Sequence, residues 1–132
     1  QKQKLEIDLP AELPAVTTDL SKLERVLTEL LNNACKYTPA GEKITITAQV
    51  KHEANGSSLL FSVKNSGVEI PPSELNHIFD KFYRVPKNDP WKHGGTGLGL
   101  ALVQKLVTHL GGSISVESDA GEICFTVQLP IG

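Results

Sequence analysis

Apolar side chains recur with helical spacing in two segments of the chain. In the first segment they fall on one face: Leu20, Leu23, Leu27, Leu30, Leu31 and Ala34. Such spacing is typical of a helix that buries one side. Thr18-Asp19 supplies an N-cap and Pro39 prevents continuation, so the pattern predicts a helix over Leu20–Tyr37. A second amphipathic helix is predicted over Leu98–Leu110, ended by Gly111-Gly112.

Alternation of apolar and polar residues predicts strands elsewhere. The expected strands are Leu5–Leu9, Lys43–Val50, Ser58–Lys64, Ser113–Glu117 and Ile123–Leu129. Asn55-Gly56 is a good tight-turn dipeptide, and Pro71-Pro72-Ser73 opens a short helix to about Phe79. Strands and helices do not alternate regularly, which argues against a doubly wound sheet. We expect an α/β two-layer sandwich, with a mixed, mostly antiparallel sheet of about five strands and three helices on one face.

Composition narrows the class of protein. The 132 residues fit one domain, taken as 1–132. A net charge of -2 gives no reason to expect nucleic acid or an anionic membrane surface as a partner, because both attract basic patches. No apolar run approaches the roughly 18 residues that span a bilayer. The absence of Met suggests a fragment excised from a longer chain.

A polar stripe lies beside the apolar face of the first predicted helix. Glu29, Asn33, Lys36 and Tyr37 are spaced i, i+4, i+7 and i+8. A half-buried polar stripe costs desolvation unless a ligand occupies it. Glutamate and asparagine oxygens suit magnesium, lysine suits phosphate, and a tyrosine ring suits a base. Taken alone, the stripe is better explained as a solvated helix face.

A glycine-rich run, Gly94–Gly99, leads directly into the second predicted helix. Glycine permits close approach of the backbone to a ligand, and a helix N-terminus favours phosphate. No Gly-Lys-Ser/Thr comes after it, so the run is not a Walker A loop. The preceding Pro90-Trp91-Lys92-His93 is loop rather than strand, which argues against a dinucleotide fingerprint. Taken alone, a flexible loop remains the other interpretation.

Together these segments resemble the catalytic, ATP-binding domain of a sensor histidine kinase. Glu29–Thr38 resembles the N box of that family, Ile78–Arg84 its F box, and Gly95–Leu100 its G2 box. Residues 109–114 resemble the segment that comes after the G2 box in these kinases. The domain belongs to the ATPase superfamily shared with gyrase, heat-shock chaperones and mismatch-repair proteins, and the F box favours the kinase branch.

The resemblance implies roles for particular residues. Asn33 would bind Mg²⁺, and Glu29 would be the catalytic residue near the metal and the γ-phosphate of ATP. Lys36 would reach a phosphate, Tyr37 would pack beside adenine, and residues 85–96 would form the ATP lid. The remaining nucleotide-binding residues would be Asn65, Gly67, Ile70, Arg84, Gly95, Thr96, Gly97, Leu98, Gly99 and Leu100.

Departures from the family pattern lie in two segments on the adenine side. Asn65 replaces the aspartate that accepts a hydrogen bond from the adenine amino group, and Glu69 replaces a glycine, adding bulk and charge. The glycine turn at Gly121 is one residue shorter than the corresponding turn of the family. It places Ile123 where the family usually has a residue with a hydroxyl group. Losing the charged acceptor would cost about 1–2 kcal/mol. Ordinary ATP binding, a degenerate pseudokinase and a changed base preference are therefore all open.

The resemblance also implies partners. None of His52, His77, His93 and His109 lies in a phosphoacceptor context, so the acceptor histidine is expected on a separate dimerisation domain of the same protein. A response regulator would act downstream. The domain itself is expected in the cytoplasm, without direct membrane contact, whether or not the parent protein is membrane-anchored. A gyrase-like ATP-hydrolysing clamp and a pure interaction module are the two alternatives.

Overall fold

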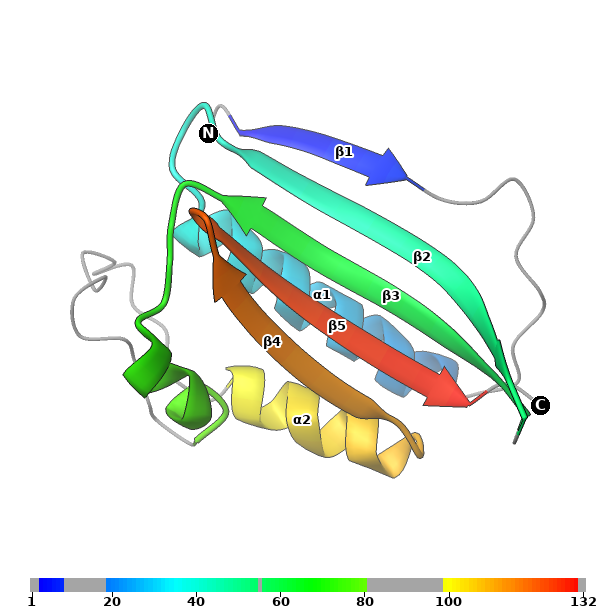
Figure 1. The fold of residues 1–132 in the computed structure, drawn as a ribbon. Helices are drawn as coiled ribbons and strands as arrows, with labels where there is room; N and C mark the ends of the chain where they lie inside the picture. The colour runs from blue at the N-terminus through cyan, green and yellow to red at the C-terminus, as the bar shows by residue number, and fades with distance from the viewer. Residues whose placement is uncertain (1–2, 9–18, 55, 81–98, 131–132) are drawn as a thin grey trace.

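A five-stranded mixed sheet forms one layer of the molecule (Figure 1). The computed structural model describes residues 3–8, 19–54, 56–80 and 99–130. The strands are β1 (Lys4–Asp8), β2 (Lys43–Glu53), β3 (Gly56–Ser66), β4 (Ser113–Asp119) and β5 (Glu122–Pro130). Their order is β1-β2-β3-β5-β4; β1 pairs with β2 in parallel, and the other pairs are antiparallel. The expected mixed, mostly antiparallel sheet is confirmed.

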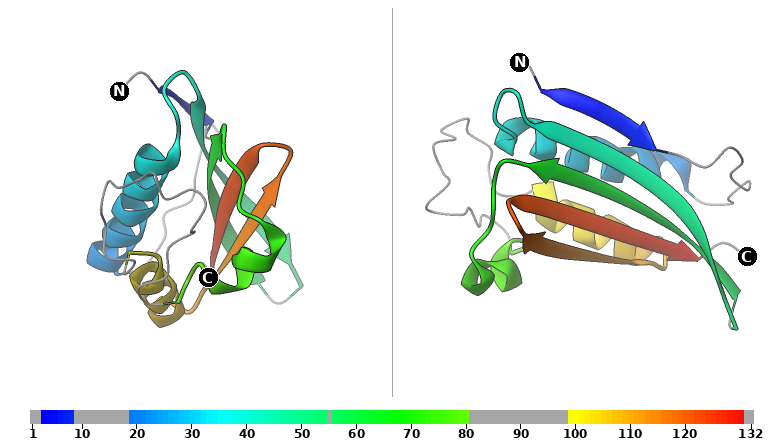
Figure 2. Two further views of the ribbon diagram at one scale, coloured as in Figure 1. Left: turned by 90° about the vertical axis from the view of Figure 1, so that its left-hand side faces the viewer. Right: turned by 45° about the horizontal axis from the view of Figure 1, so that its top comes forward.

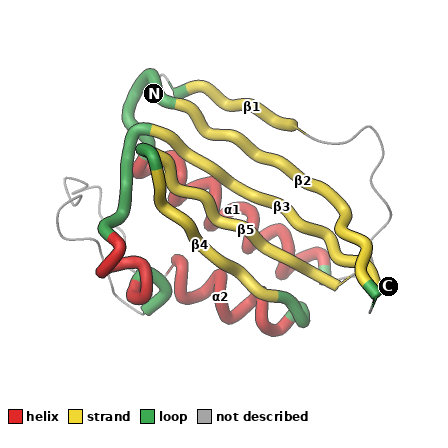
Figure 3. The backbone as a smooth tube through the Cα atoms, viewed as in Figure 1, coloured by secondary structure: helices red, strands yellow, loops and turns green. Residues whose placement is uncertain are grey.

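Two α-helices cover one face of this sheet, so the α/β two-layer prediction is also confirmed. They are α1 (Leu20–Tyr37) and α2 (Gly99–His109), which lie side by side (Figure 2, left). The predicted third helix is a 3-10 helix, η1 (Pro72–His77). It contacts β4 near the start of α2 rather than lying along the sheet face (Figure 3).

The bounds of α1 are set by its end residues. Asp19 is the N-cap, and its Oδ1 accepts a hydrogen bond from the Lys22 N–H at 3.2 Å. This satisfies one of the donors that a helix start leaves without a partner. At the other end Thr38 is extended, its N–H bonds to the Ala34 carbonyl at 3.0 Å, and Pro39 comes next. The predicted range for this helix is therefore confirmed.

The end of α2 is a glycine-dependent turn. The Gly111 N–H bonds to the Thr108 carbonyl and the Gly112 N–H to the Val107 carbonyl, each at 3.0 Å. Gly111 has φ +82°, which completes a Schellman motif. A Cβ on Gly112 would collide with the Gln128 carbonyl oxygen of β5, so this position has room only for glycine.

The core lies between the helices and the covered face of the sheet. Its most buried members are Val26, Leu30, Val63, Val103, Val107, Val127 and Leu129. In β5 alternate residues are buried, because successive side chains of a strand point to opposite faces. Phe79 packs edge-on against Phe125, with ring centroids 6.1 Å apart. The core therefore joins α1, α2 and the strands whose ends carry the predicted site.

Candidate nucleotide site

The two predicted walls of the site meet at Glu29 on α1 and Gly99 at the start of α2. A Cβ built on Gly99 would lie 3.0 Å from Glu29 Oε1, so a larger residue here would require this carboxylate to shift by a few tenths of an ångström. Glu29 Oε2 accepts a hydrogen bond from Arg25 Nε at 2.8 Å, one turn earlier on α1. The Glu29 side chain is 21% exposed. Arg25 therefore binds one oxygen of the carboxylate, and the other oxygen lies beside the first turn of α2.

The rest of the α1 stripe differs in burial. Asn33 is half-buried one turn beyond Glu29, Tyr37 is half-buried, and Lys36 is exposed. Glu29 and Asn33 are therefore oxygen donors on one helix face, as residues four apart must be. Lys36 stands further out, where an ammonium group remains hydrated. The structure keeps Glu29 and Asn33 together and leaves Lys36 at the edge.

A second group of predicted residues lies at one end of the sheet. Asn65, near the end of β3, is 3% exposed and sits between Ile44 of β2 and Ile123 of β5 in the strand register. The side-chain hydrogen bonds found within the described residues do not include its carboxamide, which nevertheless is not among the fully buried polar atoms that lack a partner. A polar group so placed is suited to a ligand that supplies its own donors and acceptors.

The segment after β3 holds the next two predicted residues. Gly67 has φ +86°, and a Cβ there would lie 2.5 Å from Glu42 Cγ, so both conformation and space require glycine. Glu42 in turn accepts a hydrogen bond from Ser66 Oγ at 2.9 Å. Ile70 is buried, and its N–H donates to Ser118 Oγ at 2.8 Å. Nothing in the sequence pattern singled out Glu42 or Ser118, since both contacts join distant parts of the chain.

The added side chain of Glu69 takes part in a hydrogen bond. Glu69 is exposed, and its Oε2 accepts a hydrogen bond from the Gly121 N–H at 2.6 Å. The side chain is thereby directed to the turn between β4 and β5. The Gly121 carbonyl accepts from the Gly67 N–H at 2.9 Å. Glu69 and the altered turn, both departures from the family pattern, are thus partners in the structure.

Part of the predicted site lies outside the described residues. This applies to Arg84, Gly95, Thr96, Gly97, Leu98 and the lid 85–96. Their roles stay predictions. Leu100, by contrast, is described and packs partly buried against the core.

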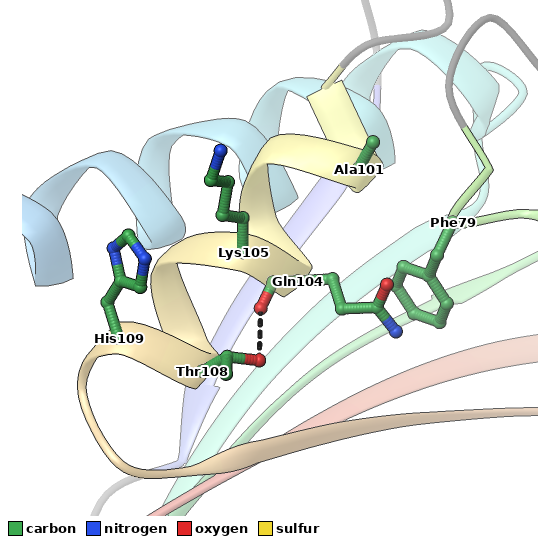
Figure 4. Close-up of a pocket in the computed structure, with 6 residues that line it drawn as sticks. All are labelled: Phe79, Ala101, Gln104, Lys105, Thr108 and His109. Carbon is green, nitrogen blue, oxygen red and sulfur yellow. Dashed lines mark hydrogen bonds between the residues drawn. The ribbon is translucent and has the colours of Figure 1, made fainter.

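A pocket of about 420 Å³ lies on another face of α2. It is lined by Phe79, Ala101, Gln104, Lys105, Thr108 and His109 (Figure 4). Thr108 Oγ1 donates to the Gln104 carbonyl at 2.9 Å, so that hydroxyl serves the helix backbone. None of the predicted nucleotide ligands lines this pocket, and it plays no part in the site assembled above.

Comparison with known proteins identifies the family of the domain. The model for "Histidine kinase-, DNA gyrase B-, and HSP90-like ATPase" matches residues 18–132. The inclusion of residues 1–17 in the same domain stays a prediction. The resemblance to a histidine kinase domain is supported from two independent directions, sequence relatives and solved structures.

Two curated sequence relatives are sensor histidine kinases. The chain is 42% identical over 112 residues to sensor histidine kinase RppB of Synechocystis, covering 84% of this chain and 24% of that protein. It is 39% identical over 123 residues to WalK of Bacillus subtilis, covering 91% of this chain and 20% of that protein. The chain therefore spans a quarter or less of the length of these relatives. In the described residues no helix is long and apolar enough to cross a membrane.

Solved structures agree in fold. The catalytic domain of histidine kinase ThkA has a TM-score of 0.80 at 27% identity, over 98% of this chain and 78% of that one. The mycobacterial sensor histidine kinase MprB has a TM-score of 0.78 at 25% identity, over 98% and 82%. These matches confirm the sequence-based assignment to a histidine-kinase-type ATPase fold. The chain belongs to the histidine kinase-, DNA gyrase B- and HSP90-like ATPase family.

Proposed function

We propose that this chain is the ATP-binding catalytic domain of a two-component sensor histidine kinase. It donates the γ-phosphate of ATP to a histidine on a separate dimerisation domain of the same protein. The observation that supports this proposal is the proximity of the Glu29 carboxylate to Gly99, the first residue of α2, where an added Cβ would lie 3.0 Å from Oε1. Residues of the N box and of the G2 box are therefore neighbours. Similarity to named sensor histidine kinases favours this function over a gyrase-like clamp.

The nucleotide would lie along the line from α2 to the end of β3. Phosphates are favoured at the α2 start, where backbone N–H groups and the helix dipole attract anions. The base would reach Asn65, with Gly67 and Ile70 lining its edge and Tyr37 beside it. Lys36, Arg84 and the backbone of residues 95–100 would contact the phosphates. Because Asn65 is buried and close to Ile123, the base end of this site is its less polar end.

Mg²⁺ fits the donor set on α1. Asn33 and Glu29 offer a carboxamide and a carboxylate oxygen one turn apart, and the described residues hold no cluster of three acidic, histidine or cysteine ligands. Mg²⁺ usually takes few protein ligands, keeping water and substrate phosphates for the rest. Bound there, it would supply charge neutralisation on the phosphates. Asn33 would hold it, and Glu29 would stand beside it.

The protein contributes to the transfer mainly by positioning the reactants, because phosphoryl transfer requires little covalent chemistry from the protein. An imidazole nitrogen attacks the γ-phosphorus, the bond to the β–γ bridging oxygen breaks, and ADP leaves. Glu29 would accept the proton of the attacking imidazole, as a general base. Its second oxygen is held by Arg25 Nε, which fixes the direction in which the free oxygen faces.

The test combines calorimetry with a transfer assay. The chain is titrated with ATP and magnesium, and ³²P transfer is measured to a separately supplied phosphoacceptor domain. Glu29→Gln should keep ATP affinity and lose most transfer; Asn33→Ala should lose the magnesium-dependent part of the affinity. Binding without transfer by the natural chain would contradict the kinase proposal. No binding at all would favour the degenerate, interaction-module alternative.

The partners are set by the proposed reaction. A phosphohistidine made in this way would pass its phosphoryl group to a response regulator. ATP and response regulators are cytoplasmic, so we place the domain in the cytoplasm. The proposal of a downstream response regulator would be contradicted if a phosphorylated dimerisation domain transferred its phosphoryl group to no receiver domain in a panel of regulators.

A further inference from the structure

A set of three hydrogen bonds ties the segment 67–70 to the β4–β5 hairpin. The Gly67 N–H donates to the Gly121 carbonyl at 2.9 Å, and the Gly121 N–H donates to Glu69 Oε2 at 2.6 Å. The Ile70 N–H donates to Ser118 Oγ at 2.8 Å. Gly121 therefore uses both its backbone groups on one partner segment. Of the three bonds, only the one to Glu69 involves a charged acceptor, and such bonds are the stronger kind.

The hairpin that Glu69 holds has an unusual turn. Asp119 pairs with Glu122, so the loop has two residues, Ala120 and Gly121. Both have positive φ, +53° and +77°, as two-residue hairpins of type I′ require. Alanine is disfavoured in that conformation, since its Cβ is crowded there. An outside hydrogen bond to the turn is one way to keep such a hairpin in place.

The held segments carry the base end of the proposed site. Glu69 lies four residues after Asn65, and Gly121 lies two residues before Ile123, which pairs with Asn65 across β3 and β5. Ser66 with Glu122 is the last pair of the β3–β5 ladder, so these hydrogen bonds extend the connection of the two strands beyond Asn65 and Ile123.

We infer that Glu69 is a positioning residue, whose hydrogen bond to the Gly121 N–H fixes the base end of the nucleotide site. The inference rests on the proposed function. The family pattern has glycine at this position, which offers backbone flexibility and no side chain. The Glu69 carboxylate instead makes a hydrogen bond that links the two sides of the base end. The same bond compensates for the strained alanine in the hairpin.

The test compares Glu69→Ala and Glu69→Gln with Glu117→Ala, a change at an exposed glutamate of β4. Glu69→Ala should weaken ATP binding by about three- to tenfold, the range of one lost hydrogen bond. GTP binding depends less on this base end, so the affinity for GTP should change little. The ratio of the ATP affinity to the GTP affinity should therefore fall. Glu69→Gln keeps an acceptor and should retain most of the ratio, and Glu117→Ala should leave it unchanged.

Amide hydrogen exchange at Gly121 gives a readout independent of nucleotide. Exchange should be slow in the natural chain and in Glu69→Gln, and faster in Glu69→Ala. Equal protection in all three would overturn the hydrogen bond as the basis of the inference. Equal weakening of ATP and GTP would show a general structural role and also overturn it. A natural chain that binds no ATP while Gly121 exchange responds as expected would point to failure of the proposed function instead.

Discussion

Asn65 lies directly opposite Ile123 across the antiparallel β3–β5 ladder. Ile44 flanks Asn65 on the other side, so a buried carboxamide has an apolar residue on each neighbouring strand. Side chains directly opposite each other on a sheet face are close neighbours. The polarity of the proposed base end therefore depends on very few atoms, and we expect changes at either residue to alter nucleotide binding measurably.

Asn65→Asp should tighten ATP binding and weaken the empty domain. A carboxylate accepts the adenine amino group in a charge-assisted hydrogen bond, which we expect to gain about tenfold in affinity. Without ligand, a buried carboxylate loses hydration, so the free energy of unfolding should fall by about 1–3 kcal/mol. Calorimetry and urea unfolding measure the two effects. Asn32→Asp, the same change at an exposed position of α1, is the control; weaker binding by Asn65→Asp would mean that the base lies elsewhere.

Ile123→Thr should restore a hydroxyl beside Asn65, and Ile123→Val is its match in shape. The threonine variant should bind ATP a few-fold more tightly than the valine variant, because a hydroxyl can bridge to the base through water. Both lose packing at a residue that is 5% exposed, about 1 kcal/mol for the valine change. Equal ATP affinities of the two variants by calorimetry would show that a hydroxyl at this position does not contribute to binding.

Gly99→Ala should separate activity from stability. The added methyl would lie 3.0 Å from Glu29 Oε1, so the carboxylate has to shift slightly and phosphoryl transfer should fall by a few-fold to about tenfold. Alanine favours helix over glycine by up to about 1 kcal/mol, so thermal stability should hold or rise. Gln104→Ala, on the exposed face of α2, serves as the control in the transfer assay. Unchanged transfer by Gly99→Ala would remove Glu29 from the catalytic role.

The core makes a prediction about stability alone. Leu30 of α1 is 1% exposed, so Leu30→Ala should lower the free energy of unfolding by about 2–5 kcal/mol. Leu5 on the edge strand β1 is 59% exposed, and the same substitution there should cost little. Urea unfolding of the two variants checks the difference. Similar losses at both sites would contradict the described packing.

Asp19 makes the stability of α1 depend on pH. The hydrogen bond from the Lys22 backbone N–H holds the pKa of this carboxyl below its ordinary value. Its contribution is therefore fully present above the unfolded-state pKa and is lost as pH falls through the lower, folded-state pKa. Asp19→Ala should lower the melting temperature at pH 7, and the difference from the natural chain should shrink in acid. A difference that stays constant with pH would rule out the charged cap.

The sequence predicted the features that local signals determine. The bounds of α1 depend on Asp19 and Pro39, and the end of α2 depends on its two glycines, because these act within a few residues. The strands β2 and β3 extend further than predicted, to Glu53 and Ser66. Backbone pairing between the two strands includes polar residues that the alternation pattern did not assign to a strand.

The orientation of Glu69 could not be predicted in the same way. Its partner, Gly121, is 52 residues away along the chain, and no periodicity or motif links them. The sequence suggested only that a glycine had been replaced by a bulky acid. The same holds for the contact between Gly99 and Glu29, where the resemblance named both residues but only packing of α1 on α2 brings them together.

One row of the sheet crosses all five strands through Leu5, Ile44, Asn65, Ile123 and Ser118. Successive residues of a strand face opposite sides, so inserting or deleting one residue within β3 would turn Asn65 to the solvent face and break this row. Point substitutions can retune the base end, whereas length changes are confined to turns. Variation among homologous domains should therefore show gaps near residues 54–55 and 120–121, and uninterrupted alignment between Gly56 and Ser66.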